Sequence, residues 1–145
     1  MHHEFNNTFG EVYLFTVFDQ PNNWIYNDWQ GLLSPGSVLE GCMGVLDILQ
    51  RTQCAYMLND NRRVLGSWQQ ANEWIEQEWI PKALAAGLRY HAHVVAPGVF
   101  GQAAAEDMHL RVGNSFHMRL FEQLDDAQTW LREKQLADHQ TALGE

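Results

Sequence analysis

Short apolar segments alternate with amphipathic segments along most of the chain. Glu11–Phe18 and Trp24–Gln30 are rich in aromatic and β-branched residues, a composition that favours two strands. The turn-forming sequence DQPNN, residues 19–23, lies between them. We therefore predict an antiparallel hairpin near the start of the fold.

After the hairpin, helical and strand patterns take turns. Ser34-Pro35 is a typical N-cap with a proline in the first turn, and apolar residues recur at helical spacing after it. The remaining predicted strands are Cys54–Leu58, Leu88–Ala96 and Phe116–Phe121, and the remaining helices are Ser67–Ala86 with a kink or restart at Pro81, Gln102–Leu110 and Asp125–Glu133. The order β-β-α-β-α-β-α-β-α predicts one α/β domain, 1–145, with a mostly parallel five-stranded sheet. Its core is expected at about 11–133, with a frayed tail at 135–145.

The polar residues 59–67 between the third strand and the second helix are predicted to form a loop, and this loop is a candidate binding site. Arg62 and Arg63 stand near a predicted helix N-terminus, where free N–H groups favour a phosphate or carboxylate. Ser67 and Gln70 fit a capping box. The alternative is a solvated turn in which the serine only caps the helix. The candidate anion-binding residues are Asn59, Asp60, Arg62, Arg63 and Ser67.

Two histidines, His91 and His93, lie two positions apart on a predicted strand and so share one face. Such a pair can hold a metal if His109 or His117 completes the site. Because no zinc-finger spacing accompanies them, hydrogen-bonded structural histidines are the favoured interpretation and no metal is predicted. An enzymatic alternative is a small hydrolase or transferase that uses this strand together with the 59–67 segment.

Motifs of nucleophilic catalysis are missing from the sequence. There is no Gly-x-Ser-x-Gly elbow, no P-loop and no dinucleotide-binding glycine pattern. Cys42 falls in an apolar helical stripe and Cys54 opens a strand, so neither occupies an evident low-pKa position. Glutamates 73, 76 and 78 fit the solvated side of an amphipathic helix. We predict no catalytic residue and no cofactor.

The six tryptophans are the largest apolar side chains of the chain. Trp68 and Trp79 belong to the apolar stripe of the second helix and are expected to pack on the sheet. Tryptophan is also enriched in interfaces and binding pockets. The candidate interface or pocket aromatics are Trp24, Trp29 and Trp74.

Charge and hydropathy narrow the class of partner. Eighteen acidic against nine basic residues give a formal charge of -9, which disfavours contact with nucleic acid or anionic lipid. No apolar run approaches the ~20 residues that a membrane-spanning helix needs, and the opening residues MHHEFNNTFGEVY lack the basic start and apolar run that are typical of a signal sequence. We expect a cytoplasmic protein without stable membrane insertion.

The closing sequence FHMRLFEQLDDAQTWLRE, the opening strand pair and the strand CAYMLND together resemble the SpoIIAA-like branch of the STAS superfamily. The resemblance covers roughly Glu11 to Glu133. It implies a small α/β domain that binds proteins or apolar ligands rather than catalysing, and some members are likened to CRAL-TRIO lipid carriers. Ser67 is the nearest counterpart of the family's phosphorylated serine, although NDNRRVLGSW lacks the Asp-Ser-Ser/Thr-Gly pattern.

The leading functional hypothesis is therefore a non-enzymatic binding or regulatory module. Its partner would be another protein, a second copy in a homodimer, or a small apolar ligand. A lipid-carrier-like binder and the small hydrolase or transferase remain the alternatives. An enzyme requires polar groups that converge in a cleft, whereas a binder requires an apolar pocket or surface.

Overall fold

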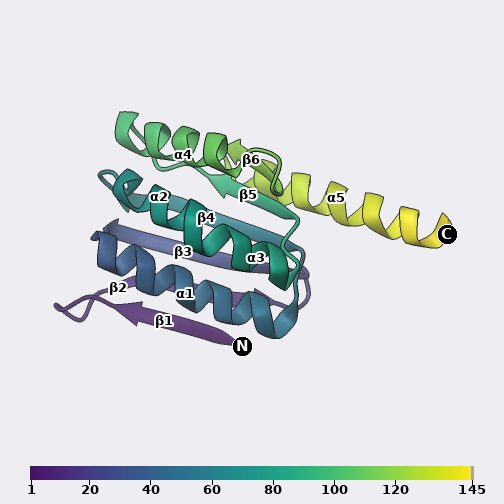
Figure 1. The fold of residues 1–145 in the computed structure, drawn as a ribbon, viewed down its shortest axis with the longest axis horizontal. Helices are drawn as coiled ribbons and strands as arrows, with labels where there is room; N and C mark the ends of the chain where they lie inside the picture. The colour runs from purple at the N-terminus through teal and green to yellow at the C-terminus, as the bar shows by residue number, and fades with distance from the viewer. Residues whose placement is uncertain (145) are drawn as a thin grey trace.

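The computed structural model describes residues 1–144, which form one mixed six-stranded sheet in the order β1-β2-β3-β4-β5-β6 (Figure 1). β1 pairs with β2 and β2 with β3 in antiparallel fashion, whereas β3 to β6 run parallel to one another. The strands are β1 (His2–Asn6), β2 (Val12–Asp19), β3 (Trp24–Leu32), β4 (Tyr56–Leu65), β5 (Tyr90–Val94) and β6 (His117–Phe121). The helices are α1 (Pro35–Thr52), α2 (Asn72–Trp74), α3 (Ile80–Ala86), α4 (Val99–Val112) and α5 (Leu124–Gly144), with a 3-10 turn η1 (Gln69–Ala71) before α2 and a π-helix η2 (Ile75–Trp79) between α2 and α3.

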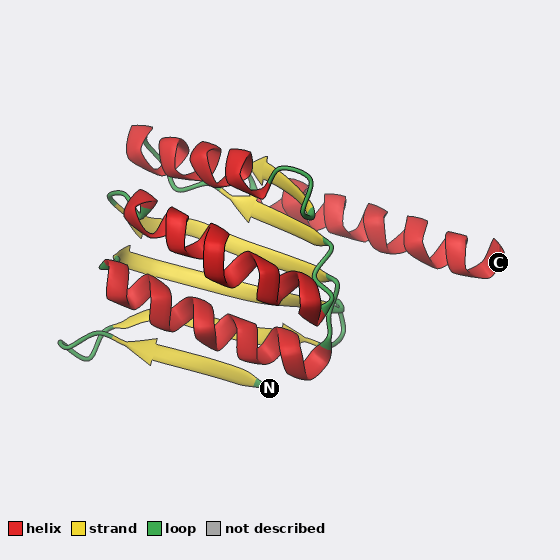
Figure 2. Cartoon of the chain, in the orientation of Figure 1, coloured by secondary structure: helices red, strands yellow, loops and turns green. Residues whose placement is uncertain are grey.

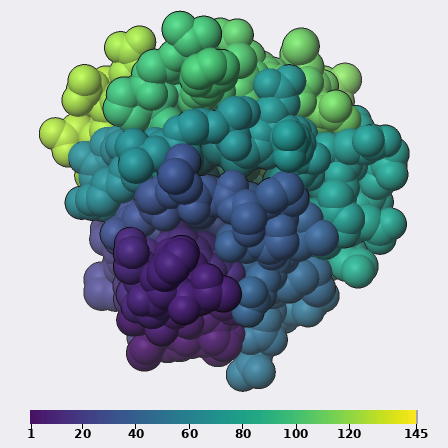
Figure 3. Space-filling view, turned by 90° about the vertical axis from the view of Figure 1, so that its left-hand side faces the viewer, coloured from purple at the N-terminus to yellow at the C-terminus, as the bar shows by residue number. Residues whose placement is uncertain are grey.

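The helices form two layers of unequal extent. Figure 2 shows α1, the α2–α3 segment and α4 side by side over one face of the sheet, while α5 lies behind it. Right-handed crossovers between strands added in one direction place the intervening helices on the same face. Figure 3 views the carboxyl edge of the parallel strands, where successive segments stack in chain order. The α/β class and the alternating order after the hairpin are thus confirmed.

The sheet has one strand more than predicted. β1 pairs with β2 along the edge, yet its sequence HHEFN has only Phe5 as an apolar residue, so it gave little strand signal. Phe5 packs against α1 at Gly44, where a Cβ would overlap its ring. Gly41 is required in the same way beneath Trp29, because a Cβ there would lie 2.5 Å from the indole. Two helical glycines therefore permit the close approach of α1 to the sheet.

The prediction that 59–67 is a loop is wrong for most of its length. β4 continues to Leu65 and pairs in parallel with β3 to its end. Asn and Asp disfavour strands by propensity, but side-chain hydrogen bonds inside the fold override that preference here. Ser67 does accept a hydrogen bond from the Gln69 N–H at 3.2 Å. The reciprocal bond from Gln70 that a capping box requires is absent from the described residues.

The restart predicted at Pro81 is confirmed, and it takes the form of the π-helix η2, after which α3 begins with Pro81 in its first turn. Proline lacks an N–H and its ring crowds the carbonyl one turn earlier, so the preceding helix must widen or break. Local π-helical turns of this kind occur often beside functional sites.

The tail that we expected to be frayed, 135–145, is helical in α5 as far as Gly144, and residue 145 lies outside the described residues. The Gln135 side chain donates to the carbonyl oxygens of Asn22 at 2.8 Å and Asn23 at 3.0 Å, and Tyr56 donates to Asp138. These contacts are polar, so an apolar stripe could not reveal them. Within residues 1–144 no helix combines the length and apolarity that crossing a membrane demands.

Candidate functional site

The inner face of the sheet carries an unusual number of polar side chains. Side chains alternate along a strand, so Asn59 and Asn61 of β4 point to the same face as His91 and His93 of β5, and Asn27 of β3 joins them. The side chains of all five are buried beneath the helices.

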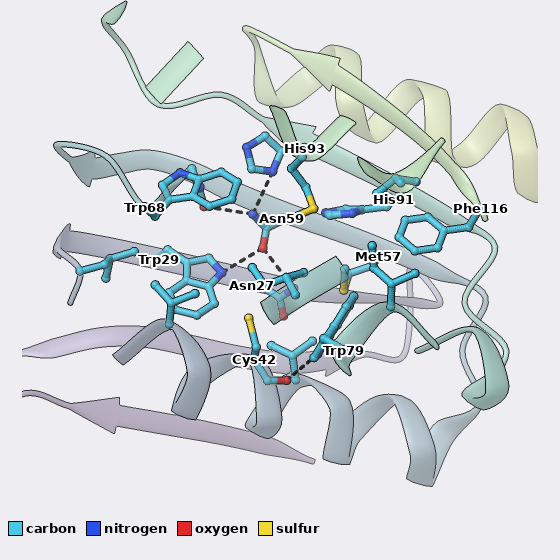
Figure 4. Close-up of a pocket in the computed structure, with 18 residues that line it drawn as sticks. Asn27, Trp29, Cys42, Met57, Asn59, Trp68, Trp79, His91, His93 and Phe116 are labelled. Carbon is cyan, nitrogen blue, oxygen red and sulfur yellow. Dashed lines mark hydrogen bonds between the residues drawn. The ribbon is translucent and has the colours of Figure 1, made fainter. Parts of the chain in front are cut away.

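These residues line a cavity of about 70 Å³ between the sheet and the helices, which we call the sheet–helix cavity (Figure 4). The rest of its wall consists of side chains of α1, η2, α3 and α4, of further side chains of β3 and β4, and of Leu33, Trp68 and Phe116 from connecting segments. Its described lining is Asn27, Trp29, Leu33, Val38, Cys42, Val45, Met57, Asn59, Asn61, Trp68, Ile75, Trp79, Ile80, His91, His93, Met108, Val112 and Phe116.

Asn59 is the centre of the polar network. Its Oδ1 accepts from Trp29 Nε1 at 2.9 Å and from Asn27 Nδ2 at 3.4 Å. Its Nδ2 donates to Asn61 Oδ1 at 3.0 Å and is 3.1 Å from His93 Nδ1. Asn59 therefore uses its full hydrogen-bonding capacity within the fold, which makes it a positioning residue.

This network fixes the protonation of the His93 ring. An indole N–H can only donate, so the Asn59 atom that faces Trp29 must be its oxygen. The amide nitrogen then faces His93 Nδ1, which must accept. A neutral imidazole has one N–H, so the proton is on Nε2, which points away from Asn59.

Several buried polar atoms that line the cavity have no partner among residues 1–144. They are Nε2 of His93, both ring nitrogens of His91 and Nε1 of Trp68. His93 is 2% exposed and His91 is 8% exposed. A buried donor or acceptor without a hydrogen-bond partner costs about 1–3 kcal/mol of stability, so each of these groups requires an explanation.

Burial keeps both histidines neutral. It lowers the pKa of His91 to about 3, with a smaller contribution from His93, and it lowers the pKa of His93 to about 4 against the opposing field of Asp60. Burial also raises the pKa of the Cys42 thiol to about 12. The described lining contains no lysine, arginine, aspartate or glutamate, so the cavity is uncharged at neutral pH.

The cavity is covered by the irregular part of the second helical segment. Ile75 and Trp79 of η2 and Ile80 of α3 contribute to its wall. Trp79 Nε1 donates to the Cys42 carbonyl of α1 at 2.8 Å, which ties this cover to the neighbouring helix (Figure 4).

The structure divides the residues of the predicted anion site between the two faces of the sheet. Asn59 points into the sheet–helix cavity, whereas Asp60, the next residue along the strand, points to the opposite face. Arg62 binds Asp60 through Nε at 3.0 Å and Nη2 at 2.9 Å, and Arg63 binds Asp28 at 3.0 Å. Both arginines thus already face carboxylates. Ser67 lies beyond the end of β4.

The predicted aromatics have three different environments. Trp29 lines the cavity, as one of the alternatives predicted. Trp24 is buried beneath α5, where the Arg132 guanidinium lies 5.3 Å from its ring centre. Trp74 is half-buried on the helical layer. β3, which carries Trp24 and Trp29, is an interior strand rather than an edge, because β1 and β2 extend the sheet beyond it.

Neither of the two histidines that could have completed a metal site with His91 and His93 forms one with them. His109 hydrogen-bonds the Met118 carbonyl at 3.0 Å, and His117 is exposed on the face of the sheet opposite to His91. No group of three or more His, Cys, Asp or Glu residues that could hold a metal occurs in residues 1–144.

Sequence reasoning missed Asn27, Asn61 and the role of Trp68. A signal was present, since Asn59 and Asn61 have the period of two that places side chains on one face of a strand. Reading 59–67 as a loop concealed that period. No family model matches the chain, and no similar protein was found among curated proteins or solved structures.

Proposed function

We propose that this protein is a non-enzymatic binding module that holds a small, mostly apolar ligand in the sheet–helix cavity. The observation that carries the proposal is the combination of an apolar wall with a few buried polar atoms that lack partners. Small-molecule sites in proteins have this composition, because apolar contacts supply affinity and a few polar groups fix orientation.

The cavity volume limits the ligand. At about 70 Å³ it is roughly half the volume of an engineered cavity of about 150 Å³ that binds benzene. The part of the ligand that is enclosed therefore has only a few heavy atoms. A longer ligand would have to displace the η2 cover.

The lining supports binding over hydrolysis or group transfer. Cys42 is the one described lining residue with a thiol or hydroxyl, and burial holds that thiol in its protonated form. A histidine with a pKa of about 3 or 4 is a weak general base at neutral pH. Chemistry that uses the His91/His93 strand thus lacks an activated nucleophile.

For the fold family, we retain the SpoIIAA-like assignment as a proposal. It is supported by the run of parallel strands β3 to β6 in chain order, with a helical segment between each pair. A cavity between sheet and helices fits the apolar ligands that the resemblance implies.

The test is whether the cavity takes up a ligand, and whether a substitution that fills the cavity prevents this uptake. Native mass spectrometry of the purified protein reports any retained ligand, and xenon titration followed by the methyl NMR signals of Met57 and Met108 reports access. Cys42→Leu adds two heavy atoms in the cavity. It should therefore abolish both the retained ligand mass and the response of the methyl signals to xenon. Val45→Ala enlarges the cavity and should strengthen xenon binding.

Unchanged methyl signals in wild type and in Val45→Ala, together with no retained mass, would rule out a ligand-binding cavity. Met43 serves as an internal control, because it is exposed and does not line the cavity.

A further inference from the structure

We infer that the ligand presents an uncharged oxygen acceptor of the carbonyl type to the Nε2–H of His93, with the indole N–H of Trp68 as a second donor. This inference rests on the proposed function and specifies the chemistry of its ligand. The two rings are neighbours, with centroids 5.7 Å apart, and both N–H groups are buried and unpartnered in the described residues.

The donor character of His93 is imposed by the fold. Trp29 orients Asn59, and Asn59 occupies the Nδ1 acceptor of His93, so the other ring nitrogen, Nε2, carries the N–H and is buried without a partner in the described residues. Thr16 completes the chain, because its hydroxyl donates to Asn27 Oδ1 at 2.6 Å and thereby turns the Asn27 amide nitrogen to Asn59. A ligand that could only donate would leave this N–H unsatisfied.

The charge of the surroundings selects an uncharged acceptor. A buried carboxylate needs a cationic partner to offset the loss of its hydration, and the described lining supplies none. A ligand ammonium would meet N–H groups rather than carboxylates. His91, with one donor and one acceptor nitrogen when neutral, adds a contact without changing this preference.

A set of four-heavy-atom probes separates these cases, because its members have nearly the same size. Acetone is the uncharged acceptor, isobutene lacks a polar atom, acetate is anionic and isopropylammonium is cationic. Binding is measured for each by titration of the Met57 and Met108 methyl signals at pH 7.5. We expect acetone to bind at least three- to tenfold more tightly than isobutene, the effect of one neutral hydrogen bond, and the two ions to show no saturable shift.

A matched pair of variants locates the donor. Trp68→Phe removes a free N–H and should weaken acetone binding about three- to tenfold while leaving isobutene unchanged. Trp79→Phe makes the same substitution in the same cavity, but its N–H is already bonded to the Cys42 carbonyl, so the acetone-to-isobutene ratio should persist. His93→Leu should abolish the ratio, and His93→Gln, which restores an N–H near the Nε2 position, should recover part of it.

The outcomes distinguish the two proposals. If xenon and isobutene bind but acetone binds no better, the cavity is a binding site and the inferred polarity is wrong, because water then satisfies the donors. Tighter binding of acetate or isopropylammonium would overturn the inference of an uncharged ligand. If no probe enters, the proposed function fails as well.

Discussion

Asn59 and Asp60 are consecutive residues of one strand that face opposite sides of the sheet, and both sides bury polar groups. On the α5 side, Asp60 is 0% exposed and accepts from the Tyr26 hydroxyl at 2.7 Å, the Arg62 N–H at 3.1 Å and the Arg62 guanidinium. On the cavity side, Asn59 is satisfied, but the groups around it are not.

The difference separates structural polar groups from available ones. Every oxygen of Asp60 has a donor, so this buried charge stabilises the packing of strands β3 and β4 and leaves nothing for a ligand. His91, His93 and Trp68 are equally buried yet keep unused nitrogens. Native structures pair the great majority of buried polar groups with protein or ordered water, so these nitrogens are available to a partner from outside the chain. Burial of polar residues alone would not have distinguished the two faces.

The largest expected difference between the two faces of the sheet is how far the free energy of unfolding falls in acid. Both cavity histidines have a depressed pKa, so between pH 6.5 and their folded values the unfolded chain binds more protons than the folded chain. Their stabilising contribution is complete above pH 6.5 and is lost as pH falls. From pH 7.5 to 4.5 we expect the free energy of unfolding to drop by about 5 kcal/mol, measured by urea denaturation.

His91→Met is the informative variant for this prediction. It removes two unpartnered nitrogens, so we expect it to be at least as stable as wild type at pH 7.5 and to lose only about half as much stability by pH 4.5. An unfolding free energy that stays flat between pH 7.5 and 5 in wild type would show that the histidines are not buried in neutral form.

On the α5 side, the larger loss of stability is expected when the Asp60 side chain is removed rather than when the pH is lowered. Asp60→Ala leaves the Tyr26 hydroxyl and the Arg62 guanidinium without their acceptor, which should cost about 3 kcal/mol. Arg63→Ala is the control, because its bond to Asp28 is formed by a side chain that is 54% exposed and should cost less than about 1 kcal/mol. Equal losses of stability in the two variants would contradict the conclusion that Asp60 stabilises the packing of strands β3 and β4.

The contribution of Asp60 to the free energy of unfolding changes over a different pH range from that of the histidines. Burial alone would raise the pKa of Asp60, but hydrogen bonds from Arg62 and Tyr26 outweigh it and hold the pKa below its ordinary value. The stabilisation from Asp60 is therefore present above about pH 3.9 and lost as pH falls through the lower folded pKa. It does not contribute to the loss predicted between pH 7.5 and 4.5.

Local periodicity was enough to predict the order of elements after the hairpin. It failed where tertiary contacts replace propensity: β1 is a strand because Phe5 packs on α1, and β4 extends to Leu65 because its asparagines bond inside the fold. The α5 tail is ordered by Gln135 and Asp138, which have no apolar pattern.

The candidate site was half predictable. The shared face of His91 and His93 follows from strand geometry, and Trp29 was already a pocket candidate. Their partner Asn59 was placed in an anion-binding loop instead. Which donors are left unused depends on distances between three strands and the connection that carries Trp68 before η1. Only the folded structure contains those distances.

The smallest contrast uses two tryptophans that differ in one hydrogen bond. Trp29 Nε1 donates to Asn59 at 2.9 Å, whereas Trp68 Nε1 has no partner in the described residues, and both rings are buried in the same wall. Trp29→Phe removes the donor that orients Asn59 and should destabilise the protein by about 1–2 kcal/mol beyond the loss of ring area.

Trp68→Phe loses comparable ring area but also removes an unsatisfied N–H, so its free energy of unfolding without ligand should be unchanged or slightly higher. The comparison is made by urea denaturation of both variants at pH 7.5, where the histidines are neutral. A Trp68→Phe variant as destabilised as Trp29→Phe would mean that a bound water already pairs with the Trp68 indole. In that case Cys42→Leu, which fills the cavity, should destabilise Trp68→Phe less than it destabilises the wild-type protein. The Trp68→Phe variant would already lack the water that the leucine displaces.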